Sequence, residues 1–209
     1  MKAQTKETQA ALTPSAALDL LKEGNLRFQE NNPINRDLLE QVSDTVSGQY
    51  PFATILGCID SRVSAELVFD QGVGDIFSAR VAGNIVNEDI LGSMEFACKL
   101  AGTKVVVVLG HTSCGAVKGA CDDAKLGNLT ALVSKIRPAV EAVKEPREAQ
   151  ERTSKNTGFV NDVAVTNVNL TLQNIREQSP VLKEMEDQGE IRILGAMYDI
   201  SNGKVTFLD

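Results

Sequence analysis

The sequence predicts an α/β fold: a mainly parallel sheet of four or five strands with an antiparallel edge, flanking helices and an N-terminal helical arm. Continuous apolar runs at 52–57 and 104–109 are typical of strands buried on both faces, as in parallel sheets. Segments with helical spacing of apolar residues alternate with such runs, which favours right-handed crossovers. An Asn-Gly pair at 202–203 separates two apolar runs and predicts a hairpin at the sheet edge.

Two helices are predicted ahead of the first strand. Thr13 and Pro14 begin the first helix with a capping hydroxyl followed by proline, and Asn32-Pro33 ends it. The second is predicted over 37–46. Because neither helix belongs to a strand–helix–strand unit, we expect both to project from the body.

The remaining elements follow from apolar patterning and from proline and glycine breaks. They are a strand over 75–81, a helix over 88–100, helices between 114 and 188 broken near Pro138, Pro146, Gly158 and Pro180, and strands over 190–200 and 205–208. We interpret 1–209 as one domain, with an arm over about 1–48 and an α/β core over 49–209.

Composition limits the classes of partner. The chain has 209 residues, a formal net charge of −7, 43% hydrophobic residues and 23% charged residues, the balance of an ordinary globular protein. An acidic chain argues against binding to nucleic acid or to an anionic membrane, because both require a basic surface. The polar N-terminus lacks the apolar core of a signal peptide. We therefore expect a cytoplasmic protein, or a periplasmic one if a signal peptide was removed ahead of Met1.

Two polar segments follow directly on two predicted parallel strands. Cys58, Asp60 and Arg62 come after the run at 52–57, and His111 and Cys114 come after the run at 104–109. Ligands of open α/β sheets bind just beyond the carboxyl ends of the strands. If the two strands are neighbours, their loops bring Cys58 to the His-x-x-Cys pair.

Two thiolates and one imidazole suit Zn²⁺ in tetrahedral geometry, and three protein ligands leave the fourth position open, as in catalytic zinc sites. His111 is the single histidine of the chain, and neither Cys98 nor Cys121 is well placed as a fourth ligand. Taken singly, Cys58 is as well explained by an apolar interior, and His111 by a structural hydrogen bond. Their joint position at strand ends favours a metal site.

Cys-x-Asp-Ser-Arg at 58–62 followed by His-x-x-Cys at 111–114 resembles the β-class carbonic anhydrases, and the resemblance extends over about residues 12–209. Further similar motifs are Gly24-Asn25-x-Arg27-Phe28, Pro51-Phe52-Ala53, Gly83-Asn84, Gly92-Ser93-x-Glu95, Gly115-Ala116-Val117-Lys118-Gly119 and Gly195-Ala196-Met197-Tyr198-Asp199. The resemblance implies reversible, zinc-dependent hydration of carbon dioxide to bicarbonate and a proton by a zinc-bound hydroxide. It also implies a homodimer or tetramer with the active site at the subunit interface.

The resemblance also assigns roles to single residues. Asp60 orients the hydroxide, Arg62 holds its carboxylate, and with that pair broken Asp60 becomes a fourth metal ligand in a closed state. Gln49 and the Gly115 N–H bond the substrate oxygen, and Phe77 forms an apolar wall.

Two residues depart from the family pattern, and two other functions stay open. Phe96 replaces a frequent tyrosine, and Ile55 stands where relatives with an inhibitory bicarbonate site have a tryptophan. Hydrolysis of carbonyl sulfide or carbon disulfide is an alternative on the same scaffold, because these linear molecules suit the same chemistry. A non-catalytic zinc-binding protein is disfavoured, because the complete set of five motif residues is present.

Overall fold

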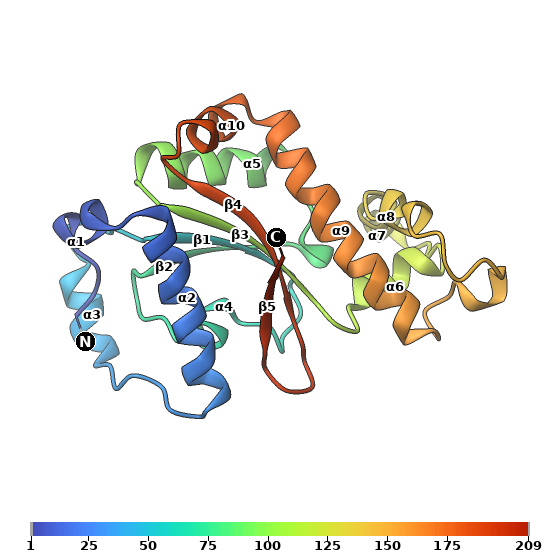
Figure 1. Ribbon diagram of the computed structural model, residues 1–209, viewed down its shortest axis with the longest axis horizontal. Coiled ribbons are helices and arrows are strands. Elements are labelled where there is room, and N and C mark those ends of the chain that lie inside the picture. Colours follow the sequence, from blue (N-terminus) through green and yellow to red (C-terminus); the bar gives the residue numbers. More distant parts are fainter. Residues whose placement is uncertain (1, 209) are drawn as a thin grey trace.

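The computed structural model describes residues 2–208 and contains a five-stranded sheet in the order β2-β1-β3-β4-β5 (Figure 1). The strands are β1 Ala53–Gly57, β2 Ile76–Arg80, β3 Val105–His111, β4 Arg192–Tyr198 and β5 Val205–Leu208. Strands β1 to β4 are parallel to one another, and β5 pairs antiparallel with β4. The predicted fold class is therefore confirmed, including its antiparallel edge.

The helices surround this sheet on both faces. They are α1 Lys6–Ala11, α2 Pro14–Gln29, α3 Leu38–Asp44, α4 Ala65–Val68, α5 Glu88–Glu95, α6 Gly115–Cys121, α7 Gly127–Ser134, α8 Arg137–Ala142, α9 Thr157–Gln178 and α10 Pro180–Asp187. Proline or glycine lies in the first turn of α8, α9 and α10, where it begins a helix. The predicted breaks at Pro138, Gly158 and Pro180 are thus helix starts.

The valine run of β3 divides its side chains between two cores. Val105, Val107 and Leu109 pack on the face that α2 and α4 cover, and Val106 and Val108 pack under α5, α9 and α10. All five are fully buried, as expected for a central parallel strand. A third apolar cluster, formed mainly by α6, α8 and α9, lies beyond the carboxyl end of the strands.

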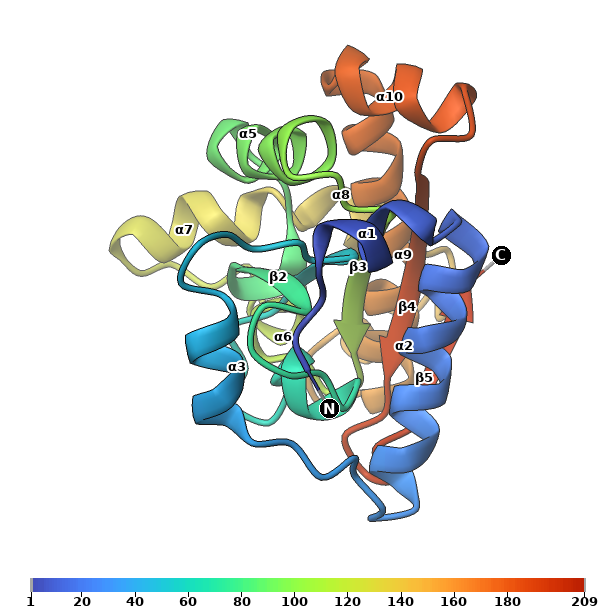
Figure 2. The same cartoon turned by 90° about the vertical axis from the view of Figure 1, so that its left-hand side faces the viewer.

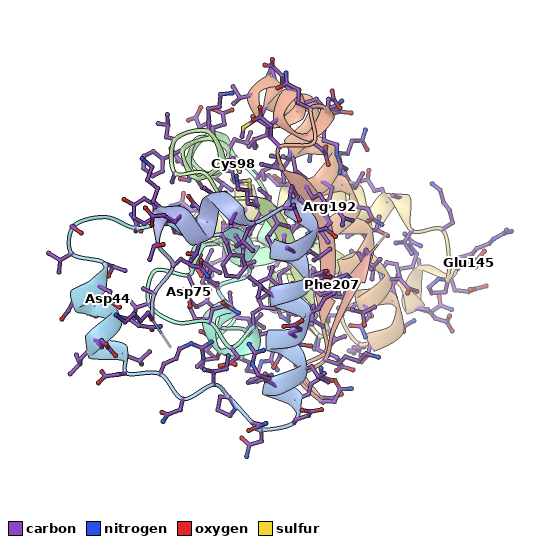
Figure 3. The ribbon with its side chains drawn as sticks, turned by 60° about the vertical axis from the view of Figure 1, so that its left-hand side comes forward. Asp44, Asp75, Cys98, Glu145, Arg192 and Phe207 are labelled. Carbon is purple, nitrogen blue, oxygen red and sulfur yellow. The ribbon has the colours of Figure 1, made fainter. Side chains whose placement is uncertain are left out.

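The N-terminal helices differ in how they attach to the sheet. Ala17 and Leu21 of α2 are fully buried in the core of one sheet face, so the expectation that both helices project from the body is wrong for α2. Phe207 of β5 lies beside this helix, with the Lys22 ammonium 5.9 Å from its ring centroid (Figure 3). In contrast, α3 lies at the edge of the molecule with Leu39 and Val46 exposed (Figure 2).

Some local features have no counterpart among the predicted elements, among them the short helix α4. The short helix α1 begins with a capping box between Thr5 and Thr8. The predicted helix over 88–100 is α-helical to Glu95 and then continues as a π-helical turn over Phe96–Leu100. Within residues 2–208, no helix combines the length and the apolar character needed to cross a lipid bilayer.

Candidate metal centre

Cys58, His111 and Cys114 meet at the carboxyl edge of the sheet. Cys58 follows β1, His111 is the last residue of β3 and Cys114 is the N-cap of α6. Because β1 and β3 are paired neighbours, the loop after one strand lies beside the end of the other. The three ligand atoms lie within 4.8 Å of one another, and the two Sγ atoms are 3.9 Å apart. All three residues are buried.

The chain reaches this geometry through two unusual backbone positions. A Cβ at Gly110 would lie 2.6 Å from a Val168 methyl carbon and 2.7 Å from the Met197 sulfur, so only glycine fits ahead of His111. Ser113, between the histidine and Cys114, adopts φ 55°, which turns the loop into α6. The spacing His-x-x-Cys therefore works here as a tight turn that directs both side chains to one point.

The hydrogen bonds of His111 leave one ring nitrogen for a metal. Its Nδ1 lies 3.0 Å from the Thr112 carbonyl oxygen, which only accepts, so Nδ1 carries the proton and Nε2 carries the lone pair. Nε2 is buried and has no hydrogen-bond partner in the structure. An unpaired buried polar atom is costly, and a metal ion at this point would remove the cost. The donor set of two sulfurs and one imidazole nitrogen fits Zn²⁺.

The two thiols share one proton. Hydrogen bonds from the Cys114 thiol and from the Gly83 N–H, the latter at 3.3 Å, lower the pKa of Cys58. The pKa of Cys114 is raised instead, because its proton is held against the Cys58 thiolate and because it is buried. The opposite shifts belong to the pair rather than to either residue. A divalent ion bound here displaces the remaining proton and neutralises both thiolates.

Asp60 stands beside the cluster and is held by Arg62. The Arg62 guanidinium donates from Nε to Oδ1 at 2.9 Å and from Nη2 to Oδ2 at 2.7 Å, a bidentate pair. These hydrogen bonds hold the pKa of Asp60 well below its usual range. Oδ2 lies 3.9 Å from Nε2 of His111. The structure therefore has the Asp60–Arg62 pair formed, with the carboxylate next to the predicted metal position.

Arg80, at the end of β2, fixes the backbone between Cys58 and Asp60. Its Nε donates to the Cys58 carbonyl at 2.8 Å, and its Nη2 donates to the Asp60 carbonyl at 2.7 Å. Arg80 was not among the predicted site residues. A signal was available, because the end of the predicted strand over 75–81 lies at the same sheet edge as the metal cluster.

The predicted substrate-binding residues divide into two groups. Gly115 is the first residue of α6, directly after Cys114, and its N–H is among those that a helix leaves without an intrahelical acceptor. Gln49 precedes β1 and Phe77 lies near the start of β2, both toward the amino end of the sheet. At about 3.3 Å a residue, β1 spans roughly 16 Å, so Gln49 is far from the cluster of its own chain.

The remaining cysteines lie outside the site. Cys98 is buried next to α5 (Figure 3) and accepts a hydrogen bond from the Thr103 hydroxyl at 3.3 Å. Burial raises the pKa of the Cys98 thiol to about 11. Cys121 is buried at the end of α6, and burial also raises its pKa to about 11. Both therefore remain neutral thiols outside the metal cluster.

Comparison with known proteins identifies the family. A family model described as carbonic anhydrase matches residues 53–205. The chain is 34% identical over 197 residues to "Carbonic anhydrase 2" of Mycobacterium tuberculosis, which covers 94% of this chain and 93% of that protein. Its fold is similar to the β-carbonic anhydrase CafA of Aspergillus fumigatus, with a TM-score of 0.70, 28% identity, and coverage of 93% of this chain and 90% of that one. It is also similar to the β-carbonic anhydrase CcaA, with a TM-score of 0.71, 27% identity, and coverage of 92% and 87%. Together with the Cys-His-Cys cluster, these matches place the chain in the β class of the carbonic anhydrase family.

Proposed function

We propose that this protein catalyses the zinc-dependent, reversible hydration of carbon dioxide to bicarbonate and a proton. The observation that supports it best is the buried Cys58–His111–Cys114 cluster with the Asp60 carboxylate beside it. Three donors would leave one position of a tetrahedral metal free, and the neighbouring carboxylate lies 3.9 Å from His111 Nε2, beside the predicted metal position.

The ion and its ligands divide the chemistry between them. Bound zinc supplies Lewis acidity, which makes hydroxide available near neutral pH. Cys58 and Cys114 contribute two negative charges that cancel the charge of Zn²⁺, and the Gly83 N–H on Cys58 Sγ offsets part of that electron donation. His111 is held in the tautomer that binds metal by the Thr112 carbonyl.

Asp60 and Arg62 orient the nucleophile. An ionised carboxylate only accepts hydrogen bonds, so Asp60 would bond a nucleophilic oxygen that still carries a proton. That hydrogen bond would turn the lone pair of the nucleophilic oxygen toward carbon dioxide. Arg62 fixes both oxygens of Asp60 and thereby keeps the carboxylate from turning to the metal itself. The Asp60–Arg62 pair would thus orient the nucleophile and keep the fourth metal position available to it.

We further propose that the working unit is a homo-oligomer in which a second copy completes the substrate pocket. Gln49 and Phe77 lie toward the opposite end of the sheet from their own chain's cluster, so they can act on substrate only across a subunit interface. The outer edge of β2 has no neighbouring strand within residues 2–208. Leu39 of α3 and Val46, which follows the helix, are 79% and 82% exposed, as expected for side chains that another subunit covers.

The proposal is tested by stopped-flow measurement of carbon dioxide hydration on protein of known metal content. The purified enzyme should contain one zinc per chain and hydrate carbon dioxide, and Cys58→Ala should lose both metal and rate. A protein that hydrates carbon dioxide equally well after the metal is stripped would contradict the proposed function.

A further inference from the structure

Two asparagines of α9 contact the two loops that carry the metal ligands. Asn167 Nδ2 donates to the Gly83 carbonyl at 2.8 Å, and Asn161 Oδ1 accepts from the Ser113 N–H at 2.9 Å. Gly83 in turn donates its N–H to Cys58 Sγ, and Ser113 lies between His111 and Cys114. One helix is therefore connected to both halves of the cluster, although neither asparagine touches a ligand atom.

The contact of Asn167 is built into the fold. Its side chain is only 3% exposed, and buried amides require hydrogen bonds to offset the loss of water. Gly83 adopts φ 74°, and a Cβ there would lie 2.4 Å from a methyl carbon of Ile136. This backbone conformation, which favours glycine, presents the carbonyl to Asn167 while the N–H faces Cys58 Sγ.

The contact of Asn161 stabilises a strained residue. Ser113 has a positive φ of 55°, a conformation that non-glycine residues rarely adopt. The amide oxygen of Asn161 accepts a hydrogen bond from the Ser113 N–H. In the described part of the structure, no other side chain bonds to Ser113. The hydrogen bond therefore fixes the turn that sets the distance between His111 and Cys114.

We propose that α9 sets the spacing of the metal ligands, with Asn167 and Asn161 as positioning residues that act through Gly83 and Ser113. This inference rests on the proposed metal centre. Removing either amide should leave the three ligands present but less well placed, so the protein should fold and bind zinc more weakly. Outer contacts of this kind usually change metal affinity by about 10- to 100-fold.

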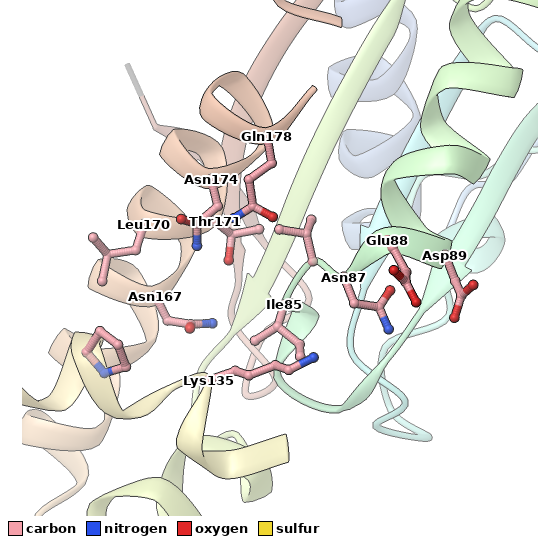
Figure 4. Close-up of a pocket in the computed structure, with 12 residues that line it drawn as sticks. Ile85, Asn87, Glu88, Asp89, Lys135, Asn167, Leu170, Thr171, Asn174 and Gln178 are labelled. Atoms are coloured by element: carbon pink, nitrogen blue, oxygen red, sulfur yellow. The ribbon is translucent and has the colours of Figure 1, made fainter. Parts of the chain in front are cut away.

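The position of Asn167 allows a clean substitution. Asn167 and Thr171 extend from α9 into a cavity of about 660 Å³, opposite Ile85 and Lys135 (Figure 4). Leucine at position 167 matches asparagine in size and has space toward this cavity. Thr171 is as buried as Asn167, and in the part of the chain that the structure describes it bonds to neither ligand loop. Thr171→Val is therefore the matched control.

The experiment measures zinc affinity by competition with a chelator for wild type, Asn167→Leu, Asn167→Ala and Thr171→Val. Circular dichroism of each zinc-loaded protein checks folding. Both Asn167 variants should bind zinc at least about tenfold more weakly than Thr171→Val. In the cobalt-substituted proteins, loss of the Gly83 contact should move the thiolate-to-metal absorption band, and the control should not. A loss below about tenfold with an unmoved band overturns the role of Asn167.

The role of Asn161 is tested by rescue. Asn161→Ala should weaken zinc binding, and adding Ser113→Gly should restore it, because glycine adopts a positive φ without the hydrogen bond. Failure of the rescue contradicts the role assigned to Asn161.

Wild type and Cys58→Ala separate this inference from the proposed function. If wild type binds no zinc through Cys58, the metal centre itself is wrong. If wild type binds zinc tightly and the α9 variants match it, only the positioning inference fails.

Discussion

Arg62 holds both carboxylate oxygens of Asp60, and the same carboxylate lies 3.9 Å from Nε2 of His111. The two relationships place a fixed, charged acceptor next to the predicted metal position. The pKa of Asp60 is held well below its usual range by the Arg62 hydrogen bonds, so the carboxyl group stays ionised at mildly acidic pH. Protonation of Asp60 is therefore not expected to limit the rate at mildly acidic pH.

Replacing Asp60 by asparagine tests the role of this acceptor. Asp60→Asn keeps the size of the side chain but offers an N–H₂ group and removes the charge, so orientation of the nucleophile should be lost. We expect zinc content to stay at one per chain and kcat to fall about 100-fold, the scale of general acid–base effects. Metal analysis and stopped-flow rates on the same sample measure both. Loss of zinc along with the rate would mean that Asp60 holds the metal instead.

A buried carboxylate away from the metal cluster, Asp70, attaches the segment after α2 to the core. Arg36 and Arg27 each bond one of its oxygens at 2.5 Å, and the side chains of Asp70 and Arg36 are 5% and 7% exposed. Asp70→Asn leaves a buried guanidinium poorly paired and should lower the free energy of unfolding by about 3 kcal/mol. The exposed Arg137–Glu141 pair provides the control, because Glu141→Gln should change it by less than about 1 kcal/mol.

The same carboxylate sets a pH dependence of stability. Burial alone raises the pKa of Asp70, but hydrogen bonds from Arg27, the Ile34 N–H and Arg36 together hold it below its ordinary value. The pKa of Asp70 is lower in the folded protein than in the unfolded chain. The contribution of Asp70 to the free energy of unfolding is therefore fully present above about pH 4 and is lost as the pH falls through the folded pKa. The difference in free energy of unfolding between wild type and Asp70→Asn, measured by urea unfolding, should narrow as the pH falls from 7 to 3. A constant difference between the two proteins across this range would contradict the assignment.

The positions of the strands and the antiparallel edge were predictable because the sequence marks them strongly, whereas the order of the strands in the sheet was not predicted. The apolar runs at 52–57 and 104–109 have no competing helical pattern, and the Asn-Gly turn near the C-terminus identifies the antiparallel edge. The helix α1 lacks such a signal, since only Gln9 of its six residues is buried. The π-helical turn over Phe96–Leu100 lies within a predicted helix, and its apolar spacing does not distinguish a π-helical from an α-helical turn.

The ligand cluster was predictable, and the residues that support it were not. Strand polarity places Cys58 and His111 at one sheet edge, so pairing of β1 with β3 suffices to bring them together. Strand polarity also places Gln49 at the opposite, amino-terminal edge of the sheet. The predicted role of Gln49 did not take this position into account. Asn167 reaches Gly83 across 84 residues of chain, and a sequence gives no sign of such a contact until the helix is packed.

The exposed face of α3 predicts how the oligomer can be broken. Val46→Asp and Leu39→Asp should shift the protein toward a monomer and lower the hydration rate, because Gln49 and Phe77 would no longer reach a neighbouring cluster. Leu126, 71% exposed between α6 and α7, gives a control substitution that should leave the assembly intact. Analytical ultracentrifugation with parallel rate measurements tests this. An active wild-type monomer at micromolar concentration would rule out the interface role of Gln49 and Phe77.

Proton export should depend on buffer, because the single histidine of the chain is a predicted metal ligand. Transfer is fastest when the pKa of the donor lies near the working pH, and ordinary carboxylates, tyrosines and lysines titrate far from neutrality. We expect kcat at saturating carbon dioxide to rise with imidazole-type buffer at fixed pH and ionic strength. A rate that stays flat from low to high buffer would reveal an internal proton-transfer group.

The central claim is that zinc held by Cys58, His111 and Cys114 performs the hydration, and metal reconstitution tests it most directly. Protein stripped of metal and titrated with Zn²⁺ should regain hydration activity linearly and reach a plateau at one zinc per chain. Ala substitution of each of the three ligands in turn should abolish both the binding and the recovery. Activity that does not follow zinc content, or full zinc and full rate in any one of the three variants, would contradict the account.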